Sequence, residues 1–168
     1  LLAFQIGHTV SKNELANKLG LNKKTVSRYL DLLEKAFVIK EVRGFSRNLR
    51  KSVYKSSRYY FLDIGIRNAL INNFNQLSMR NDIGMLWENF IVAERLKKQE
   101  YDNLHSNNYF WRTYDQQEVD WVEERGGVLH GYEMKWQQQS IQEPKDWSRT
   151  YDEVSFDIIH QENWIDFV

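Results

Sequence analysis

The sequence of 168 residues contains no cysteine, which removes disulfide bonds, thiol nucleophiles and cysteine-ligated zinc sites at once. It also lacks any apolar run approaching the roughly 18 residues that a membrane-spanning helix requires. No basic segment followed by an apolar one marks a secretory signal. We therefore expect a cytoplasmic protein without membrane contact. Because the chain begins at Leu1, within an expected helix, we also expect it to be a piece of a longer protein.

Neither sign of charge is in excess overall, but the charges are distributed unevenly along the chain. The sequence has 23 Lys or Arg and 23 Asp or Glu, a formal net charge of zero. Residues 1–62 carry 13 basic and 4 acidic side chains, a net of +9, whereas residues 63–168 carry 10 and 19, a net of −9. Such asymmetry indicates two parts with different partners. We predict a DNA-binding domain over residues 1–62 and a second domain over residues 63–168.

The basic part is expected to begin with two short helices. Ser11 and Glu14 have the spacing of a capping box, and Gly20 is expected to end the helix that they begin. Asn22 is expected to cap a second helix over residues 23–36. The side chains expected to face the core are Leu15, Ala16, Leu19, Val26, Leu30 and Leu33. Two helices joined by a tight glycine turn are typical of a helix-turn-helix, whose second helix presents its N-terminal residues to the DNA major groove.

Two β-type segments, residues 36–42 and 58–63, follow these helices and enclose a basic loop. Two strands with a basic loop after a helix-turn-helix form a wing, whose cations contact DNA phosphates. The residues expected to contact double-stranded DNA are Lys23, Lys24, Thr25, Ser27, Arg28, Arg47, Arg50, Lys51 and Lys55. The alternative is a protein-contact module whose lysine and arginine side chains are merely solvated.

The acidic part has the pattern of a mixed α/β domain. The expected elements, in order, are a helix from Asp63 to about Phe74, an amphipathic helix over 84–100, strands over 107–114, 118–124 and 127–136, a short helix carrying Trp147 and Tyr151, and strands over 154–160 and 163–168. Ile66 and Leu70 are expected to face the core. The whole chain is therefore expected to be α+β, or mixed α/β.

Four polar residues of the acidic part suggest a metal-dependent hydrolytic site. Side chains alternate along a strand, so Asp120 is expected on the face opposite Val119 and Trp121, and Glu133 shares a face with Lys135. Two carboxylates can hold Mg²⁺ through oxygen ligands, and the metal acidifies water and neutralises phosphoryl charge. The lysine can orient that water or stabilise developing charge. Glu88, a helical glutamate, is a candidate to complete the ligand shell.

The E-x-K pattern is weak by itself, and a plainer interpretation stays open. A second match, Glu143-Pro144-Lys145, lies ten residues downstream, where proline indicates a loop or the first turn of a helix. Two charged residues on an exposed strand face are commonly just solvated, and Glu88 alone is as well explained by a solvated or salt-bridged position. Four histidines are too scattered for a zinc site: His8, His105, His130 and His160.

A helical Glu, an Asp on a strand and E-x-K on the next strand, followed by helix and strand, resemble the PD-(D/E)XK nuclease-like superfamily. The segments TVSRYLDLLEKAFVI, SRYYFLDIGIRNAL, GMLWENFIVAERL, EVDWV and GYEMKW, in that order, are similar more particularly to an uncharacterised region. That region follows an AAA+-type ATPase domain in many archaeal and bacterial proteins. The resemblance implies an N-terminal winged helix-turn-helix followed by a restriction-endonuclease-like α/β domain, with an ATPase domain upstream.

The resemblance also implies roles for the four polar residues. Asp120 and Glu133 would be metal ligands for Mg²⁺, Lys135 would orient the attacking water, and Glu88 would be an accessory acid. No Walker A pattern occurs in this sequence, so the chain itself is not expected to bind ATP.

Three functions remain open at this point. The first is a DNA-binding, Mg²⁺-dependent nuclease of the PD-(D/E)XK type. The second is a non-catalytic DNA-binding or regulatory module whose nuclease-like domain is only a scaffold. The third is an acidic docking surface for the ATPase domain or a neighbouring subunit. A net charge of −9 repels DNA unless a bound cation offsets it, which favours metal loading or protein docking.

Overall fold

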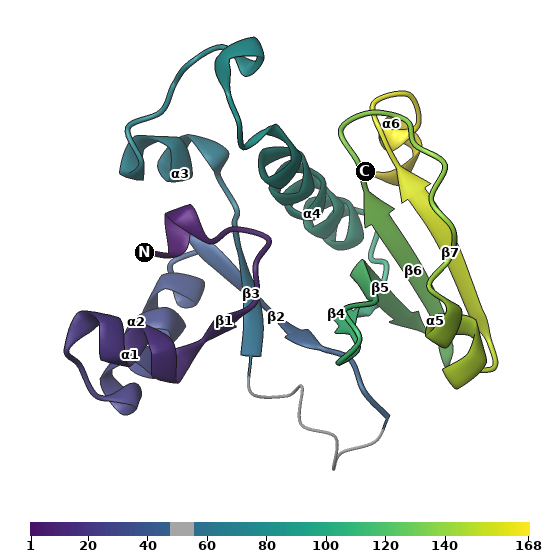
Figure 1. Ribbon diagram of the computed structural model, residues 1–168, viewed down its shortest axis with the longest axis horizontal. Helices are drawn as coiled ribbons and strands as arrows, with labels where there is room; N and C mark the ends of the chain where they lie inside the picture. The colour runs from purple at the N-terminus through teal and green to yellow at the C-terminus, as the bar shows by residue number, and fades with distance from the viewer. Residues whose placement is uncertain (48–55) are drawn as a thin grey trace.

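One mixed sheet of seven strands joins both parts of the chain in the computed structural model, which describes residues 1–47 and 56–168 (Figure 1). The strands are β1 (Val10–Ser11), β2 (Ile39–Gly44), β3 (Ser56–Phe61), β4 (Asn107–Arg112), β5 (Glu118–Arg125), β6 (Val128–Met134) and β7 (Val154–Ile159). Their order across the sheet is β1-β3-β2-β4-β5-β6-β7. The two parts meet where β2 pairs in parallel with β4, with Arg43 opposite Tyr109 and Gly44 opposite Phe110.

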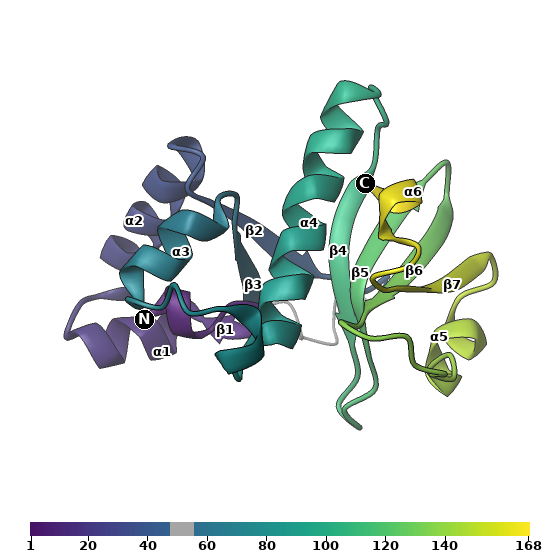
Figure 2. The same ribbon diagram turned by 90° about the horizontal axis from the view of Figure 1, so that it is seen from above.

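Helices from both parts of the chain lie beside this sheet. They are α1 (Lys12–Leu19), α2 (Lys23–Lys35), α3 (Ile64–Leu70), α4 (Ile83–Tyr101), α5 (Lys145–Thr150) and α6 (Trp164–Phe167), with short 3-10 helices η1 (Leu2–Phe4) and η3 (Leu77–Met79). Figure 2 shows α1, α2 and α3 on one side of the long helix α4, and strands β4 to β7 on the other. None of the helices in the described ranges has the length and apolar character needed to cross a bilayer.

The two helices of the basic part form where the sequence predicts them. The Asn22 side chain accepts the backbone N–H three residues later at 2.8 Å, and Gly20 ends α1 with φ 63°. Helix α1 begins after Ser11, but the Ser11 side chain makes no capping hydrogen bond. Glu14 instead accepts from Lys18 at 2.6 Å, one turn along the helix. The capping-box prediction is therefore wrong, because the glutamate is held away from the helix N-terminus.

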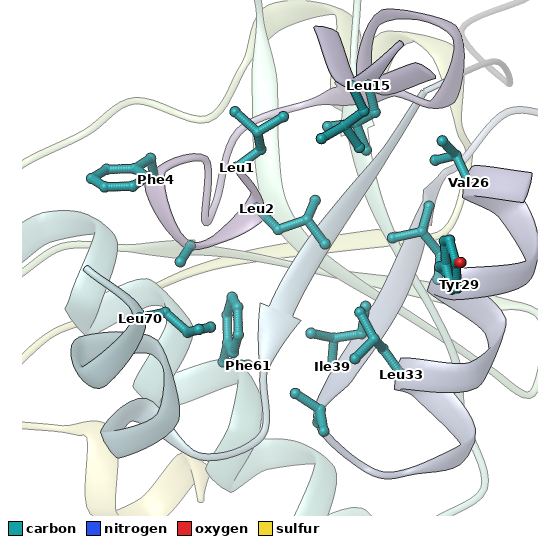
Figure 3. Close-up of a pocket in the computed structure, with 14 residues that line it drawn as sticks. Leu1, Leu2, Phe4, Leu15, Val26, Tyr29, Leu33, Ile39, Phe61 and Leu70 are labelled. Atoms are coloured by element: carbon teal, nitrogen blue, oxygen red, sulfur yellow. The ribbon is translucent and has the colours of Figure 1, made fainter. Parts of the chain in front are cut away.

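Helical periodicity predicted which faces of the helices are apolar, but it did not predict how far the rest of the chain buries those faces. Four predicted core residues of α1 and α2 are buried: Leu15, Ala16, Val26 and Leu30. Four others, predicted to face the core, are exposed: Leu19, Leu33, Ile66 and Leu70. Helix α3 also ends at Leu70 rather than near Phe74. Three of the exposed side chains, Leu19, Leu33 and Leu70, line one groove, which Figure 3 shows.

From α4 onward the chain forms a helix, three antiparallel strands, a helix and a parallel strand. Strands β4, β5 and β6 pair antiparallel, and β7 returns parallel to β6 after α5. Trp87 and Ile91 of α4 pack in one buried cluster with Trp121. Trp147 of α5 packs in another cluster with Val119. The end of this sheet therefore has a helix on each face.

A β-bulge in β5 changes the alternation of its side chains. Between Val119 and Val122, β5 contains one more residue than the stretch of β4 that pairs with it. Val119 consequently belongs to the cluster with α5, whereas Trp121 belongs to the cluster with α4. The prediction that Val119 and Trp121 share a face is therefore wrong. The extra residue lies at Asp120 and Trp121, so the bulge sets the direction of the Asp120 side chain.

The prediction of a last strand over residues 163–168 is wrong, because this segment contains helix α6. The Asn163 side chain donates to the carbonyl of Ile158 and accepts the N–H of His160, both at 2.8 Å, and so turns the chain sharply after β7. The turn brings Phe167 against Tyr132, with ring centroids 4.6 Å apart. Local sequence pattern favoured a strand, but the asparagine turn and aromatic packing determine the conformation.

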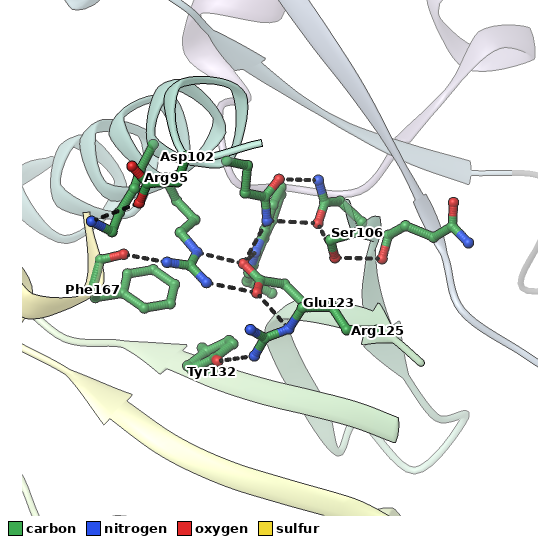
Figure 4. Close-up of polar contacts among 12 residues, drawn as sticks. Arg95, Asp102, Ser106, Glu123, Arg125, Tyr132 and Phe167 are labelled. Carbon is green, nitrogen blue, oxygen red and sulfur yellow. Dashed lines mark hydrogen bonds and ion pairs between the residues drawn. The ribbon is translucent and has the colours of Figure 1, made fainter. Parts of the chain in front are cut away.

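A buried ion pair fixes α4 to the sheet and to α6 (Figure 4). Arg95 donates to both carboxylate oxygens of Glu123, at 2.6 and 2.8 Å, and to the carbonyl of Phe167 at 2.6 Å. Burial opposes ionisation of Glu123, but the bonds from Arg95 and Trp121 outweigh it and lower its pKa. Because every charge in this network is paired, we assign it a structural role.

Candidate active site

Arg58, in β3, binds carboxylates from α4 and β5. Its Nη1 lies 3.2 Å from Glu88 Oε1 and 3.1 Å from Asp120 Oδ1, and its Nη2 lies 3.0 Å from Glu118 Oε2. The guanidinium carbon is also 4.9 Å from the ring centre of Phe110. Only 2% of the Arg58 side chain is exposed. A strand of the basic part therefore supplies a buried cation to the carboxylates of the acidic part.

Glu88 lies on α4 and is closely enclosed. The hydroxyl of Tyr60 donates to Glu88 Oε1 at 2.7 Å, the same oxygen that contacts Arg58. Gly7, with φ +71°, approaches so closely that a Cβ there would be 2.8 Å from Glu88 Oε2. Burial, reinforced by the charge of Asp120, raises the pKa of Glu88 to about 8 against the opposing effects of Arg58 and Tyr60. Glu88 is therefore an enclosed, proton-retaining acid.

Asp120 links the two strands that carry the predicted ligands. Its Oδ2 accepts the backbone N–H of Met134 in β6 at 3.1 Å, while its Oδ1 contacts Arg58. The residue is buried. The bond to Met134 holds the Asp120 carboxylate beside the segment that contains Glu133 and Lys135.

Glu133 and Lys135 form an ion pair at the end of β6, with Nζ 2.7 Å from Oε1. The other oxygen of Glu133, Oε2, is buried and has no hydrogen-bond partner among the described residues. Burial and the nearby Asp120 raise the pKa of Glu133 to about 7, although Lys135 opposes this. Burial disfavours the ammonium of Lys135, but the bond to Glu133 and the surrounding carboxylates outweigh burial and raise its pKa. Lys135 is therefore a cationic donor at neutral pH.

The structure brings the four predicted polar residues into one electrostatic cluster. The charge of Asp120 raises the pKa of both Glu88 and Glu133, and the charges of all three carboxylates raise the pKa of Lys135. Sequence reasoning missed three further members: Arg58, Tyr60 and Glu118. A signal existed for the first two, because they are two residues apart on a predicted strand and therefore share a face.

The carboxylates of this cluster can be compared with the oxygen ligands that a divalent cation requires. Among residues 1–47 and 56–168, no group of three or more His, Asp or Glu is placed to hold a metal. The Oε1 atom of Glu88 is already engaged by Arg58 and Tyr60. Asp120 and Glu133 remain, and Oε2 of Glu133 is a buried oxygen without a partner in the described part of the chain. These two carboxylates fit a hard cation such as Mg²⁺ that keeps several water ligands.

The predicted DNA-contacting residues lie on different parts of the surface. Lys23, Lys24 and Arg28 are exposed at the N-terminal half of α2 and form no ion pair with another described residue, while Thr25 and Ser27 are half-buried. The guanidinium of Arg47 lies 5.7 Å from the ring centre of Tyr151, within the acidic part. Three predicted positions lie outside the described residues: Arg50, Lys51 and Lys55.

Comparison with known proteins gives two matches to domain families and two relatives. Residues 1–77 match a domain of unknown function (DUF8612), and residues 83–160 match another domain of unknown function (DUF4143). Uncharacterized protein Mb2031c of Mycobacterium bovis and uncharacterized protein Rv2008c of Mycobacterium tuberculosis are each 29% identical to this chain over 137 residues. The match covers 80% of this chain but 30% of each relative, so the chain spans about 30% of their length. No solved structure matches the chain significantly.

Proposed function

We propose that this chain is a DNA-binding module of a longer protein and that the cluster around Asp120 hydrolyses phosphodiester bonds with a divalent cation. The observation that carries this proposal is the combination of Asp120, Glu133 and Lys135, in which a buried glutamate oxygen has no partner among the described residues. The order of helix, three antiparallel strands, helix and parallel strand supports the resemblance to PD-(D/E)XK nucleases.

Asp120 and Glu133 would hold the cation, which supplies an acidified water and neutralises charge on the phosphoryl group. Lys135, cationic at neutral pH, would donate a hydrogen bond to the attacking water or to a phosphoryl oxygen, and the proton of that water, acidified by the cation, would pass to solvent. Arg58 positions Asp120 through the 3.1 Å contact between Nη1 and Oδ1, and the same nitrogen contacts Glu88. Glu88 has a pKa of about 8 and is mainly protonated at neutral pH, which suits it to donate a proton rather than bind metal.

DNA would be held by the basic part. Exposed cations on the first half of α2, Lys23, Lys24 and Arg28, have the position from which a helix-turn-helix contacts the duplex. A net charge of +9 over residues 1–62 favours association with phosphates. The division into a winged helix and a nuclease-like domain, an upstream ATPase domain and a cytoplasmic location are part of the same proposal.

A non-catalytic role is favoured by Arg58. Its guanidinium contacts both Asp120 and Glu88, and it offsets the charge of Asp120 without a metal. On this second proposal the nuclease-like core is a scaffold that displays the DNA-binding helices or contacts an ATPase domain. Mg²⁺-dependent cleavage of duplex DNA, lost in Asp120→Asn, separates the two: cleavage supports the hydrolytic role, and its absence supports the scaffold.

A further inference from the structure

A cavity of about 400 Å³ lies between the residues that follow β2, the β4–β5 hairpin and α5. Phe45, Trp111 and Tyr151, all buried, give it aromatic walls. The indole N–H of Trp111 donates to the hydroxyl of Tyr151 at 3.1 Å, so the polar atom of the indole is satisfied within the wall. A fourth ring, that of Tyr114, is 71% exposed and lines the same cavity. A cavity of this size with aromatic walls suits a small planar group.

The cavity is joined to the candidate active site by Arg112, one of its lining residues. Arg112 Nε lies 3.6 Å from Glu118 Oε2, and Arg58 Nη2 lies 3.0 Å from the same oxygen. Arg58 in turn contacts Asp120 at 3.1 Å. A group bound in this cavity would therefore lie beside the carboxylates that we propose to hold the cation.

The charges that line the cavity cancel. They belong to two arginines and two aspartates: Arg47, Arg112, Asp115 and Asp146. A lining without net charge gives no preference for a phosphate, whereas a neutral group with both hydrogen-bond donors and acceptors can use both kinds of side chain. Nucleobases are neutral, planar groups of this kind.

Two of the charged side chains have hydrogen-bonding atoms to spare. Gln117 donates to Oδ2 of Asp146 at 3.0 Å and accepts the backbone N–H of Asp146 at 3.1 Å. The other oxygen of Asp146, Oδ1, accepts no hydrogen bond from another described residue. Arg47 makes one hydrogen bond to a described residue, the carbonyl of Gly127 at 3.4 Å, so other N–H groups of its guanidinium are left for a ligand. Asp146 is therefore a positioned acceptor, and Arg47 is a donor.

These two side chains distinguish among the bases, because a carboxylate only accepts hydrogen bonds and a guanidinium only donates them. Guanine presents a pair of adjacent donors, N1–H and the N2 amino group, which suits a carboxylate. It also presents a pair of adjacent acceptors, O6 and N7, which suits an arginine. The other three DNA bases have no such pair of adjacent N–H donors. Guanine is therefore the base that can use Asp146 and Arg47 together.

We propose that this cavity binds a guanine base from a single-stranded or extrahelical part of a DNA substrate. Asp146 accepts from N1–H and N2, Arg47 donates to O6 or N7, and the ring of Tyr114 stacks on the base. The base has to be unpaired, because a duplex encloses the edge that carries N1 and N2. This inference rests on the proposed action on DNA, and it adds a preference for an unpaired guanine next to the cleaved bond.

Binding of short oligonucleotides to the full 168-residue chain tests the proposal, with fluorescence anisotropy as the measurement. Three fluorescent oligothymidylates of about ten nucleotides carry a single guanine, adenine or cytosine at the centre. EDTA is present, so the result depends on neither metal nor cleavage. The guanine oligonucleotide should bind at least about tenfold tighter than the other two, which is the discrimination that one bidentate contact supplies. Phosphate contacts are common to all three and cancel in this ratio.

Variants locate the preference. Asp146→Asn and Arg47→Met should each reduce the guanine preference to below about threefold. Asp152→Asn and Arg149→Met are the matched controls, because they make the same changes at exposed positions outside the cavity, and both should keep the preference. Tyr114→Ala should weaken all three oligonucleotides alike, by about tenfold, through the loss of stacking. Circular dichroism checks that each variant is folded.

Three results would overturn the proposal. In the first, the three oligonucleotides bind equally. In the second, Asp146→Asn keeps the guanine preference as fully as Asp152→Asn does. In the third, free guanosine monophosphate competes as strongly as the guanine oligonucleotide, which would assign the cavity to a free nucleotide. A guanine preference without any plasmid cleavage would support the cavity and contradict only the hydrolytic role.

Discussion

Arg58 Nη1 and Asp120 Oδ1 lie 3.1 Å apart, although the two residues are separated by 62 positions in the chain. Arg58 belongs to the part with net charge +9 and Asp120 to the part with net charge −9. The same nitrogen contacts Glu88 on α4. One buried guanidinium therefore ties β3 to both α4 and β5, and the candidate active site is built from both parts of the chain.

Replacing Arg58 by methionine should lower the free energy of unfolding by about 3–5 kcal/mol, because it leaves buried carboxylates without their cation. Urea denaturation at neutral pH measures this change. Arg43→Met is the control: Arg43 is exposed and its nitrogen is 4.0 Å from Glu41, so its loss should be below about 1 kcal/mol. Equal effects for the two variants would show that Arg58 does not hold the parts together.

Asp82, just before α4, should make stability depend on acid pH. Hydrogen bonds from Arg80, opposed by burial and assisted by Arg67, lower the pKa of Asp82 from 3.8 to about 2. A lowered carboxylate pKa stabilises the fold above the unfolded value, and this stabilisation disappears as the pH falls through the folded value. The difference in unfolding free energy between wild type and Asp82→Asn should thus be full at pH 7. It should shrink between pH 3.8 and about 2.

Urea titrations of the two proteins at several pH values measure that difference. A gap between wild type and Asp82→Asn that stays constant from neutral to strongly acid pH would mean that Asp82 contributes through packing rather than through its charge.

DNA binding should depend on the exposed cations of α2. Lys24→Ala and Arg28→Ala should each weaken binding to duplex DNA. Each should also reduce the slope of log affinity against log salt by about 0.9 for every phosphate that the side chain no longer neutralises. Fluorescence anisotropy over a range of salt concentrations provides both quantities. Lys97→Ala, which removes a cation paired with Glu94 on α4, should leave the slope unchanged. If all three variants gave the wild-type slope, α2 would not contact DNA.

Local signals in the sequence predicted most elements of the fold. Asn22 caps α2 as expected, Asp63 caps the helix that was expected to begin there, and Gly126 and Gly127 turn the chain between β5 and β6 with positive φ. These features depend on neighbouring residues alone, so they can be predicted from a short window. Whether the side chains of Leu33 and Leu70 are buried depends on which other elements pack over them, and helical periodicity does not show this.

The candidate site was predicted less completely, because it depends on contacts between distant segments. Glu133 lies in β6 and Lys135 follows the last residue of that strand, so their pairing could be expected from the alternation of a strand predicted over residues 127–136. The direction of Asp120 instead depends on a bulge that forms only when β5 pairs with β4. Arg58 resembled one more basic residue of a DNA-binding domain, and only the folding of β3 beside α4 brings it to the carboxylates.

The central claim is that Asp120 and Glu133 form a metal-dependent hydrolytic site, and cleavage of supercoiled plasmid DNA in Mg²⁺ tests it most directly. Wild type should nick the plasmid, and Asp120→Asn or Glu133→Gln should reduce the rate by about 100-fold or more. Lys145→Met, in the second E-x-K sequence, should cleave like wild type. Equal cleavage by every variant, or no cleavage by wild type at any Mg²⁺ concentration, would contradict the claim.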